Sequence, residues 1–159
     1  MKKVVIIILL ALTLVGCQTN SSEVDKTQYL EYKKQINETS EFLDISALPF
    51  TTNAIVTKIS DEMISYAITI SNPQINLNNI SALLIHNQFT EELYPSVGLF
   101  NEKLNLLLTS DSMNSFVLVG YLETMEESLD IEFKLLFNYV NDNGQSITLI
   151  SKFNSSDFT

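Results

Sequence analysis

The alternation of large apolar side chains with small or polar ones constrains the fold of this chain most. Between residues 64 and 70 the apolar side chains Ile64, Tyr66, Ile68 and Ile70 alternate with Ser65, Ala67 and Thr69. The same period of two returns over 131–139, and the turn sequence Asn141-Asp142-Asn143-Gly144 follows it directly. Since successive strand side chains point to opposite faces, this period predicts half-buried strands. Asn, Asp and Gly tolerate the positive φ of tight hairpins, so we expect a hairpin returning through 147–153.

Shorter segments of the same kind lie between these two. They are Thr52–Ile59, Ile80–Asn87, Lys103–Leu108 and Ser115–Leu122. About seven strands without crossover helices favour an antiparallel β-sandwich over a parallel α/β sheet. We therefore expect a mainly β fold, a single sandwich domain spanning 49–159, preceded by a short N-terminal helix.

The segment before the sandwich shows a helical period. Tyr29, Tyr32 and Ile36 recur every three to four residues, and Ser22 is a plausible N-cap. We expect a short helical segment and linker over 26–48, with a polar, flexible tether over 17–25 before it. The helix either binds a partner, packs on the domain or forms a partly ordered stalk.

The N-terminus has the features of an export signal. Lys2 and Lys3 precede Val4–Val15, a run in which Thr13 is the only polar residue. A transmembrane helix needs roughly 20 apolar residues, and this run is shorter. Leu14-Val15-Gly16-Cys17 resembles the lipobox of bacterial lipoproteins. The resemblance implies removal of residues 1–16 and a diacylglycerol on Cys17, which would then be the membrane anchor. A plain signal peptide and an uncleaved anchor are the alternatives.

The charge of the chain limits its partners. The precursor carries nine basic and nineteen acidic residues, a formal charge of −10. Without Lys2 and Lys3 seven basic residues remain against nineteen acids, so the mature chain carries −12. This balance argues against nucleic acid as a partner, because neutralising phosphates requires cationic side chains. It also gives repulsion from an anionic bilayer, so the lipid must hold the protein there.

A second resemblance concerns the domain itself. Asn72-Pro73, the run 94–100 and Val117-Leu118-Val119-Gly120-Tyr121 are similar to small, uncharacterised Gram-positive lipoproteins with a single immunoglobulin-like domain. This likeness implies an immunoglobulin-like sandwich over about 41–153 and carries no catalytic residue. The missing arginine, together with abundant Asn and Ile, also hints at an AT-rich Gram-positive genome.

Residues suited to chemistry are few. One cysteine rules out an intrachain disulfide, and one histidine makes a histidine-based metal site improbable, so no metal or cofactor is expected. His86, at a strand end, is interpreted as an ordinary strand-end or loop histidine and not as a catalytic base. Asp142-Asn143-Gly144 lacks the spacing of an EF-hand. The acidic groups are interpreted as solvated faces or sites of weak cation binding; they are Glu91-Glu92 and Glu123, Glu126, Glu127 and Asp130.

The segment Tyr94–Phe100 is the main irregularity. Pro95 and Gly98 interrupt an apolar run. A loop presenting Tyr94, Pro95 and Phe100 is a candidate partner-binding site, because aromatic residues supply contact area at low entropic cost. The alternative is a bulged edge strand whose aromatic residues fill the sandwich.

These features predict a membrane-tethered, extracytoplasmic lipoprotein that acts as a non-enzymatic binding or accessory module for an envelope ligand or protein. The alternatives are an assembly subunit that pairs its edge strand with a partner, and an extracytoplasmic enzyme with a site built on carboxylates such as Glu91 or Glu126.

Overall fold

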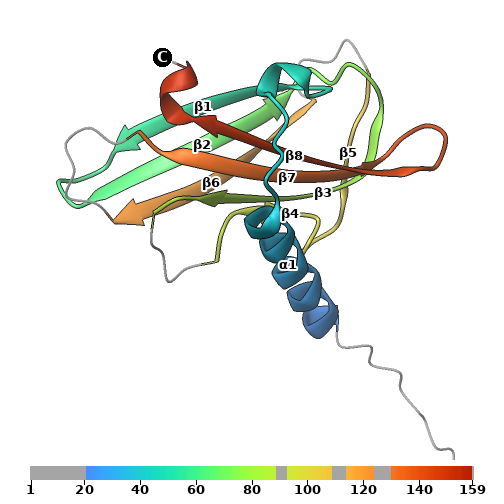
Figure 1. Cartoon of the computed structure of the whole chain (residues 1–159), viewed down its shortest axis with the longest axis horizontal. Coiled ribbons are helices and arrows are strands. Elements are labelled where there is room, and N and C mark those ends of the chain that lie inside the picture. Colours follow the sequence, from blue (N-terminus) through green and yellow to red (C-terminus); the bar gives the residue numbers. More distant parts are fainter. Residues whose placement is uncertain (1–20, 89–92, 109–113, 124–129, 159) are drawn as a thin grey trace, which may run out of the picture.

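The computed structural model describes residues 21–88, 93–108, 114–123 and 130–158, with side chains from residue 26 onward. Eight strands follow one long helix (Figure 1). The elements are α1 (Ser21–Glu38), the 3₁₀ turn η1 (Ile45–Ala47), β1 (Thr51–Lys58), β2 (Met63–Ser71), β3 (Leu77–His86), β4 (Ser96–Val97), β5 (Leu104–Leu106), β6 (Ser115–Glu123), β7 (Glu132–Val140), β8 (Ser146–Asn154) and the 3₁₀ turn η2 (Ser155–Phe158).

The strands form two antiparallel sheets. One has the order β1-β2-β6 and the other β4-β3-β7-β8, with β5 paired to the start of β3. If the strands are lettered in chain order with β4 as C′, the sheets are ABE and C′CFG. This division matches that of immunoglobulin-like sandwiches except for β5, which pairs with β3 instead of joining the first sheet. The predicted mainly β sandwich is therefore confirmed.

The main core lies between the two sheets. Alternate residues of β2 and β7 supply its largest side chains, among them Tyr66, Ile68, Phe133 and Phe137. The outward residues of β2 are only partly covered, as the period of two requires. The alternation read from the sequence therefore marks the side of each strand that the core buries.

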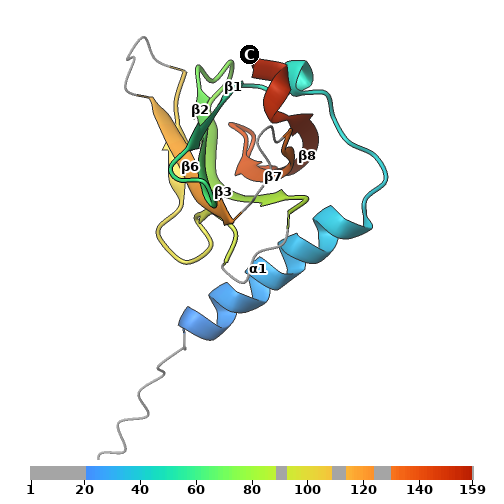
Figure 2. The same ribbon diagram turned by 90° about the vertical axis from the view of Figure 1, so that its left-hand side faces the viewer.

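Helix α1 builds a second, smaller core on the outer face of β3 and β7. Tyr29, Tyr32 and Ile36 pack there against Leu83 and Leu136, while the amino-terminal end of α1 extends past the sandwich (Figure 2). Both faces of β3 are thus buried, which explains its continuous apolar run, because a strand covered on both sides need not alternate. Of the alternatives for this helix, packing on the domain is confirmed.

The helix is longer than predicted. It begins at Ser21 and ends at Glu38. Residues 21–25, assigned to the flexible tether, are therefore helical, and Ser22 lies inside the helix instead of capping it. The prediction failed because this polar stretch has no apolar period, and the helix needs none before it reaches the sheet at Tyr29.

The eighth strand lies in the segment 94–100, where the structure confirms the edge strand that was one of the two interpretations of this segment. Residues Ser96–Val97 form the short edge strand β4, paired with Ala82 and Leu83 of β3. Strand β3 begins three residues earlier than predicted and carries a bulge between Asn78 and Ser81. A two-residue strand is too short to show a period of two.

The predicted β7–β8 hairpin is confirmed. Asn141 Oδ1 accepts hydrogen bonds from the backbone N–H groups of Asn143 and Gln145, both at 3.0 Å. Gly144 adopts a φ of +76°. The side chain of Asn141 and the freedom of Gly144 therefore fix the turn that sets the register of both strands. No helix within the described parts of the chain is long and apolar enough to cross a membrane.

Candidate functional site

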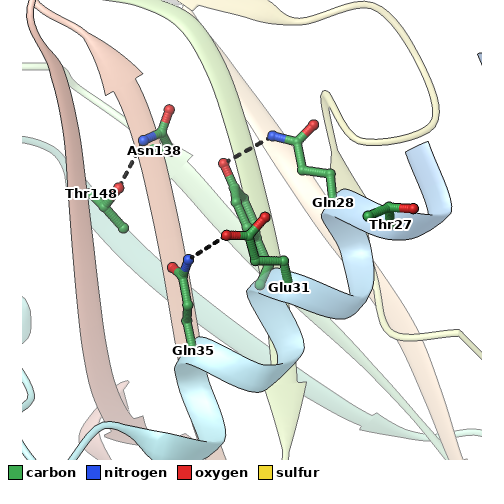
Figure 3. A pocket seen from close by; sticks show the side chains of 7 residues that line it. Thr27, Gln28, Glu31, Gln35, Asn138 and Thr148 are labelled. Carbon is green, nitrogen blue, oxygen red and sulfur yellow. Dashed lines mark hydrogen bonds between the residues drawn. The ribbon is translucent and has the colours of Figure 1, made fainter. Parts of the chain in front are cut away.

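A polar groove of about 540 Å³ lies between α1 and the hairpin strands β7 and β8 (Figure 3). The helix forms one wall and β7 with β8 forms the other. Its lining consists of Thr27, Gln28, Glu31, Tyr32, Gln35, Asn138 and Thr148. The groove exists because the helix crosses the sheet on three anchor residues, which leaves the polar side chains beside them facing the strands.

The groove offers many hydrogen-bonding groups and one formal charge, Glu31. Gln35 Nε2 donates to Glu31 Oε1 at 3.4 Å, and Asn138 Nδ2 donates to Thr148 Oγ1 at 2.8 Å. Gln28 Nε2 donates to Tyr32 Oη, which also shares a 2.8 Å hydrogen bond with the Oγ of the buried Ser81. Amides and hydroxyls both donate and accept, so this lining suits a neutral ligand rich in the same groups.

The segment Tyr94–Phe100 is built into the edge of the domain beside α1. Tyr94 N–H donates to Tyr29 Oη at 3.0 Å, and the Lys33 ammonium lies 5.1 Å from the Tyr94 ring centre. The Pro95 carbonyl accepts a hydrogen bond from Leu84 N–H at 3.0 Å. Phe100 is 44 % exposed with its ring against Tyr29. Tyr94 and Pro95 are thus half-buried, Tyr94 against the helix and Pro95 against β3, and Phe100 is the exposed residue of the three.

His86 ends β3 in a buried aromatic site. Its ring meets those of Tyr66 and Tyr94 edge-on, with ring centres 5.4 and 5.0 Å away. Burial lowers the pKa of His86, partly opposed by a hydrogen bond with the Gln88 backbone. Within the described residues Nδ1 has no hydrogen-bond partner. This environment favours the neutral imidazole.

Because His86 is buried, we expect the fold to lose stability on acidification already at pH values above those at which carboxylates titrate. The unfolded chain protonates this histidine near pH 6.5, whereas the folded chain does so only at lower pH, so stability falls as the pH drops from 7.5 toward 5. Since His86 is the only histidine, His86→Gln removes this dependence. Thermal melts of both proteins from pH 7.5 to 5 measure it. Equal losses of melting temperature in wild type and variant would refute this role of His86.

The acidic residues do not converge in the described structure. Glu123 is exposed at the end of β6, and Asp130 accepts hydrogen bonds from Ser156 N–H and Ser155 Oγ, which lower the pKa of its carboxyl. Asp130 therefore fixes the turn η2 at the C-terminus. Among the described residues no three His, Cys, Asp or Glu side chains are placed to hold a metal ion. Cys17, Glu91, Glu92, Glu126 and Glu127 lie outside the described residues.

The groove was not predicted from the sequence. Its helical wall is Thr27, Gln28, Glu31 and Gln35, a polar stripe at a spacing of three to four that runs beside the buried stripe. The spacing marks one helix face, but only the packed structure shows that this face borders a strand and not open solvent.

Comparison of the chain with family models, curated proteins and solved structures found no match.

Proposed function

We propose that this chain is a lipid-anchored, non-enzymatic binding module of the bacterial cell envelope. In this proposal Cys17 carries the lipid on the extracytoplasmic face of the membrane, and the groove beside α1 binds a neutral polymer of the envelope. The two parts rest on different residues and are tested separately.

Two observations support lipid anchoring: residues Leu14–Cys17 resemble a lipobox, and α1 begins at Ser21, shortly after Cys17. Four residues span at most about 14 Å, so a lipid on Cys17 would keep the start of the helix close to the bilayer surface. The helix is packed on the sandwich through Tyr29, Tyr32 and Ile36, so a lipid at its start would hold the whole domain near the membrane. With a charge of −12, the domain itself would not adhere to an anionic membrane.

The groove supports the binding role. Its walls come from the helix on one side and from β7 and β8 on the other, and its side-chain amides pair with neighbouring side chains. A saccharide that carries N-acetyl and hydroxyl groups can exchange these internal hydrogen bonds for bonds of the same kind. We therefore propose neutral amino-sugar polymers as the ligand class.

The binding role is tested with a neutral tetramer of N-acetylglucosamine and the soluble mature chain, residues 17–159 with Cys17→Ser. All described contacts lie within this chain. We expect NMR shifts at the side-chain amides of Gln28, Gln35 and Asn138. The double variant Gln35→Ala, Asn138→Ala should lose roughly thirtyfold in affinity, since each of the two hydrogen bonds contributes about 1 kcal/mol.

The matched control is Asn37→Ala, an amide removed from an exposed position of the same helix. This variant should bind the tetramer as the wild type does. If the tetramer shifts no groove resonance, or Asn37→Ala weakens binding as much as the double variant, the groove does not bind this ligand class.

A further inference from the structure

Three exposed apolar side chains gather around Tyr29, where α1 leaves the sandwich. Leu30 is 54 % exposed on the helix, and Leu93 and Phe100 are 69 % and 44 % exposed on either side of β4. The ring centres of Phe100 and Tyr29 lie 5.4 Å apart. Leu30 is the next residue of the helix, and Leu93 precedes the residue whose N–H donates to Tyr29 Oη. Leu30, Leu93 and Phe100 form the apolar edge patch.

This patch lies on the side of the domain from which the chain enters. Figure 2 shows the amino-terminal end of α1 extending beyond the sandwich, on the side where the yellow segment joins β4 to β5. The helix begins at Ser21, four residues after Cys17. Four residues span at most about 14 Å, and the eight residues from Ser21 to Tyr29 rise about 12 Å along the helix. A bilayer that holds Cys17 therefore lies within about 26 Å of Tyr29, a distance that a tilt of α1 can close.

The charges beside the patch suit phospholipid headgroups. Lys26 and Lys33 lie four residues before and three residues after Leu30, so they share its flank of the helix. Lys103 follows β4 in the next loop, beside Glu102. These lysines are three of the seven basic residues left after removal of residues 1–16. A lysine next to apolar residues can lay its stem along them and extend its ammonium to a phosphate, as at membrane interfaces.

We propose that the apolar edge patch contacts the membrane surface, with Phe100 and Leu30 in the interfacial layer of the bilayer. The contact rests on the anchoring proposed above, because three side chains cannot hold an acidic domain on a bilayer by themselves. A short tether gives an effective concentration in the mM range, at which a weak contact is populated.

The contact would orient the domain. The groove lies on the other flank of α1, at Gln28, Glu31 and Gln35, whereas Leu30 is on the flank that contacts the bilayer. With the patch on the membrane, the groove therefore stays open to polymers of the envelope.

The test needs no lipidation in cells, because Cys17 carries the only thiol of the chain. The mature chain, residues 17–159, is coupled through this thiol to a maleimide lipid in phosphatidylcholine vesicles. The chain has no tryptophan, so Phe100→Trp and Leu30→Trp each place a single fluorescent reporter in the patch. Ile55→Trp is the matched control, since Ile55 is 56 % exposed on β1, which lies far from the amino-terminal end of α1 (Figure 1).

The vesicle lipids carry bromine atoms high on their acyl chains, which quench tryptophan that reaches them. We expect the emission of both patch reporters to shift to the blue and to fall roughly twofold relative to the same variants free in solution, because the tethered contact is mostly formed. Ile55→Trp should show neither change, and thermal melts should show all three variants folded.

Unquenched emission from both patch reporters, or equal quenching of Ile55→Trp, overturns the proposal. The coupled chain can show quenching even if cells leave Cys17 unmodified. Conversely, a chain that is lipidated in cells can hold both reporters in water. The membrane contact and the proposed anchoring therefore fail separately.

Discussion

Replacing Gly98 by alanine is expected to lower the free energy of unfolding by about 2–5 kcal/mol. Gly98 has a φ of +66°, a conformation that costs an L-residue about 1–2 kcal/mol. A Cβ there would also lie 2.3 Å from the Ile80 carbonyl oxygen, which belongs to the backbone beside the β3 bulge and cannot move freely. Overpacking of this kind typically costs a further 1–3 kcal/mol. Urea unfolding at fixed pH measures the loss.

Two other glycines separate the contribution of backbone strain from the contribution of overpacking. Gly144 has a positive φ with open space around it, so Gly144→Ala should cost about 1 kcal/mol through backbone strain alone. At Gly120 only the space is limiting: a Cβ there meets the ring of Tyr66, which is packed against Phe133, so Gly120→Ala should cost about 1–3 kcal/mol. If Gly98→Ala is no more destabilising than Gly144→Ala, β4 does not approach β3 as described.

The alternation of residues 64–70 was sufficient to predict β2, and the Asn141–Gly144 turn was sufficient to predict the β7–β8 hairpin. Both signals are local, since the side-chain period and the turn chemistry lie within a few residues. The need for glycine at position 98 depends instead on β3. The atoms nearest to a Cβ at Gly98 belong to Ile80 and Ser81, which lie 17 to 18 positions earlier in the chain. No local pattern marks such an approach.

The candidate site was less predictable than the fold. Tyr29, Tyr32 and Ile36 correctly indicated a buried helix face. The sequence did not indicate which strands that face covers, and therefore did not place Asn138 and Thr148 opposite Gln35. The apolar outward residues of β6 were equally unexpected, because the period of two assigns Val117 and Val119 to one face without saying whether a partner covers it.

Substituting Cys17 is expected to have an all-or-none effect on lipid attachment. The thiol of Cys17 is the only one in the chain, so Cys17→Ala removes every site for thioether attachment of a diacylglycerol. Cells grown with an alkyne analogue of palmitate should label the wild type and leave the variant at background. Two acyl chains hold a protein on a bilayer where one does so only marginally, so this loss would remove the proposed anchor.

The control is Thr19→Ala, a change two residues beyond the cysteine that keeps the thiol. This variant should take up the label as the wild type does. Because the resemblance implies that lipid is added before cleavage, Cys17→Ala should also retain residues 1–16 and migrate as a larger protein. Equal labelling of Cys17→Ala and wild type would refute lipidation at this residue.

The intact mass of the protein purified from the membrane fraction tests lipid anchoring most directly. We expect a chain that begins at Cys17 and carries the additional mass of a diacylglycerol. A chain with unmodified Cys17, either cleaved at another position or still joined to Met1–Gly16, would contradict a lipid-anchored module.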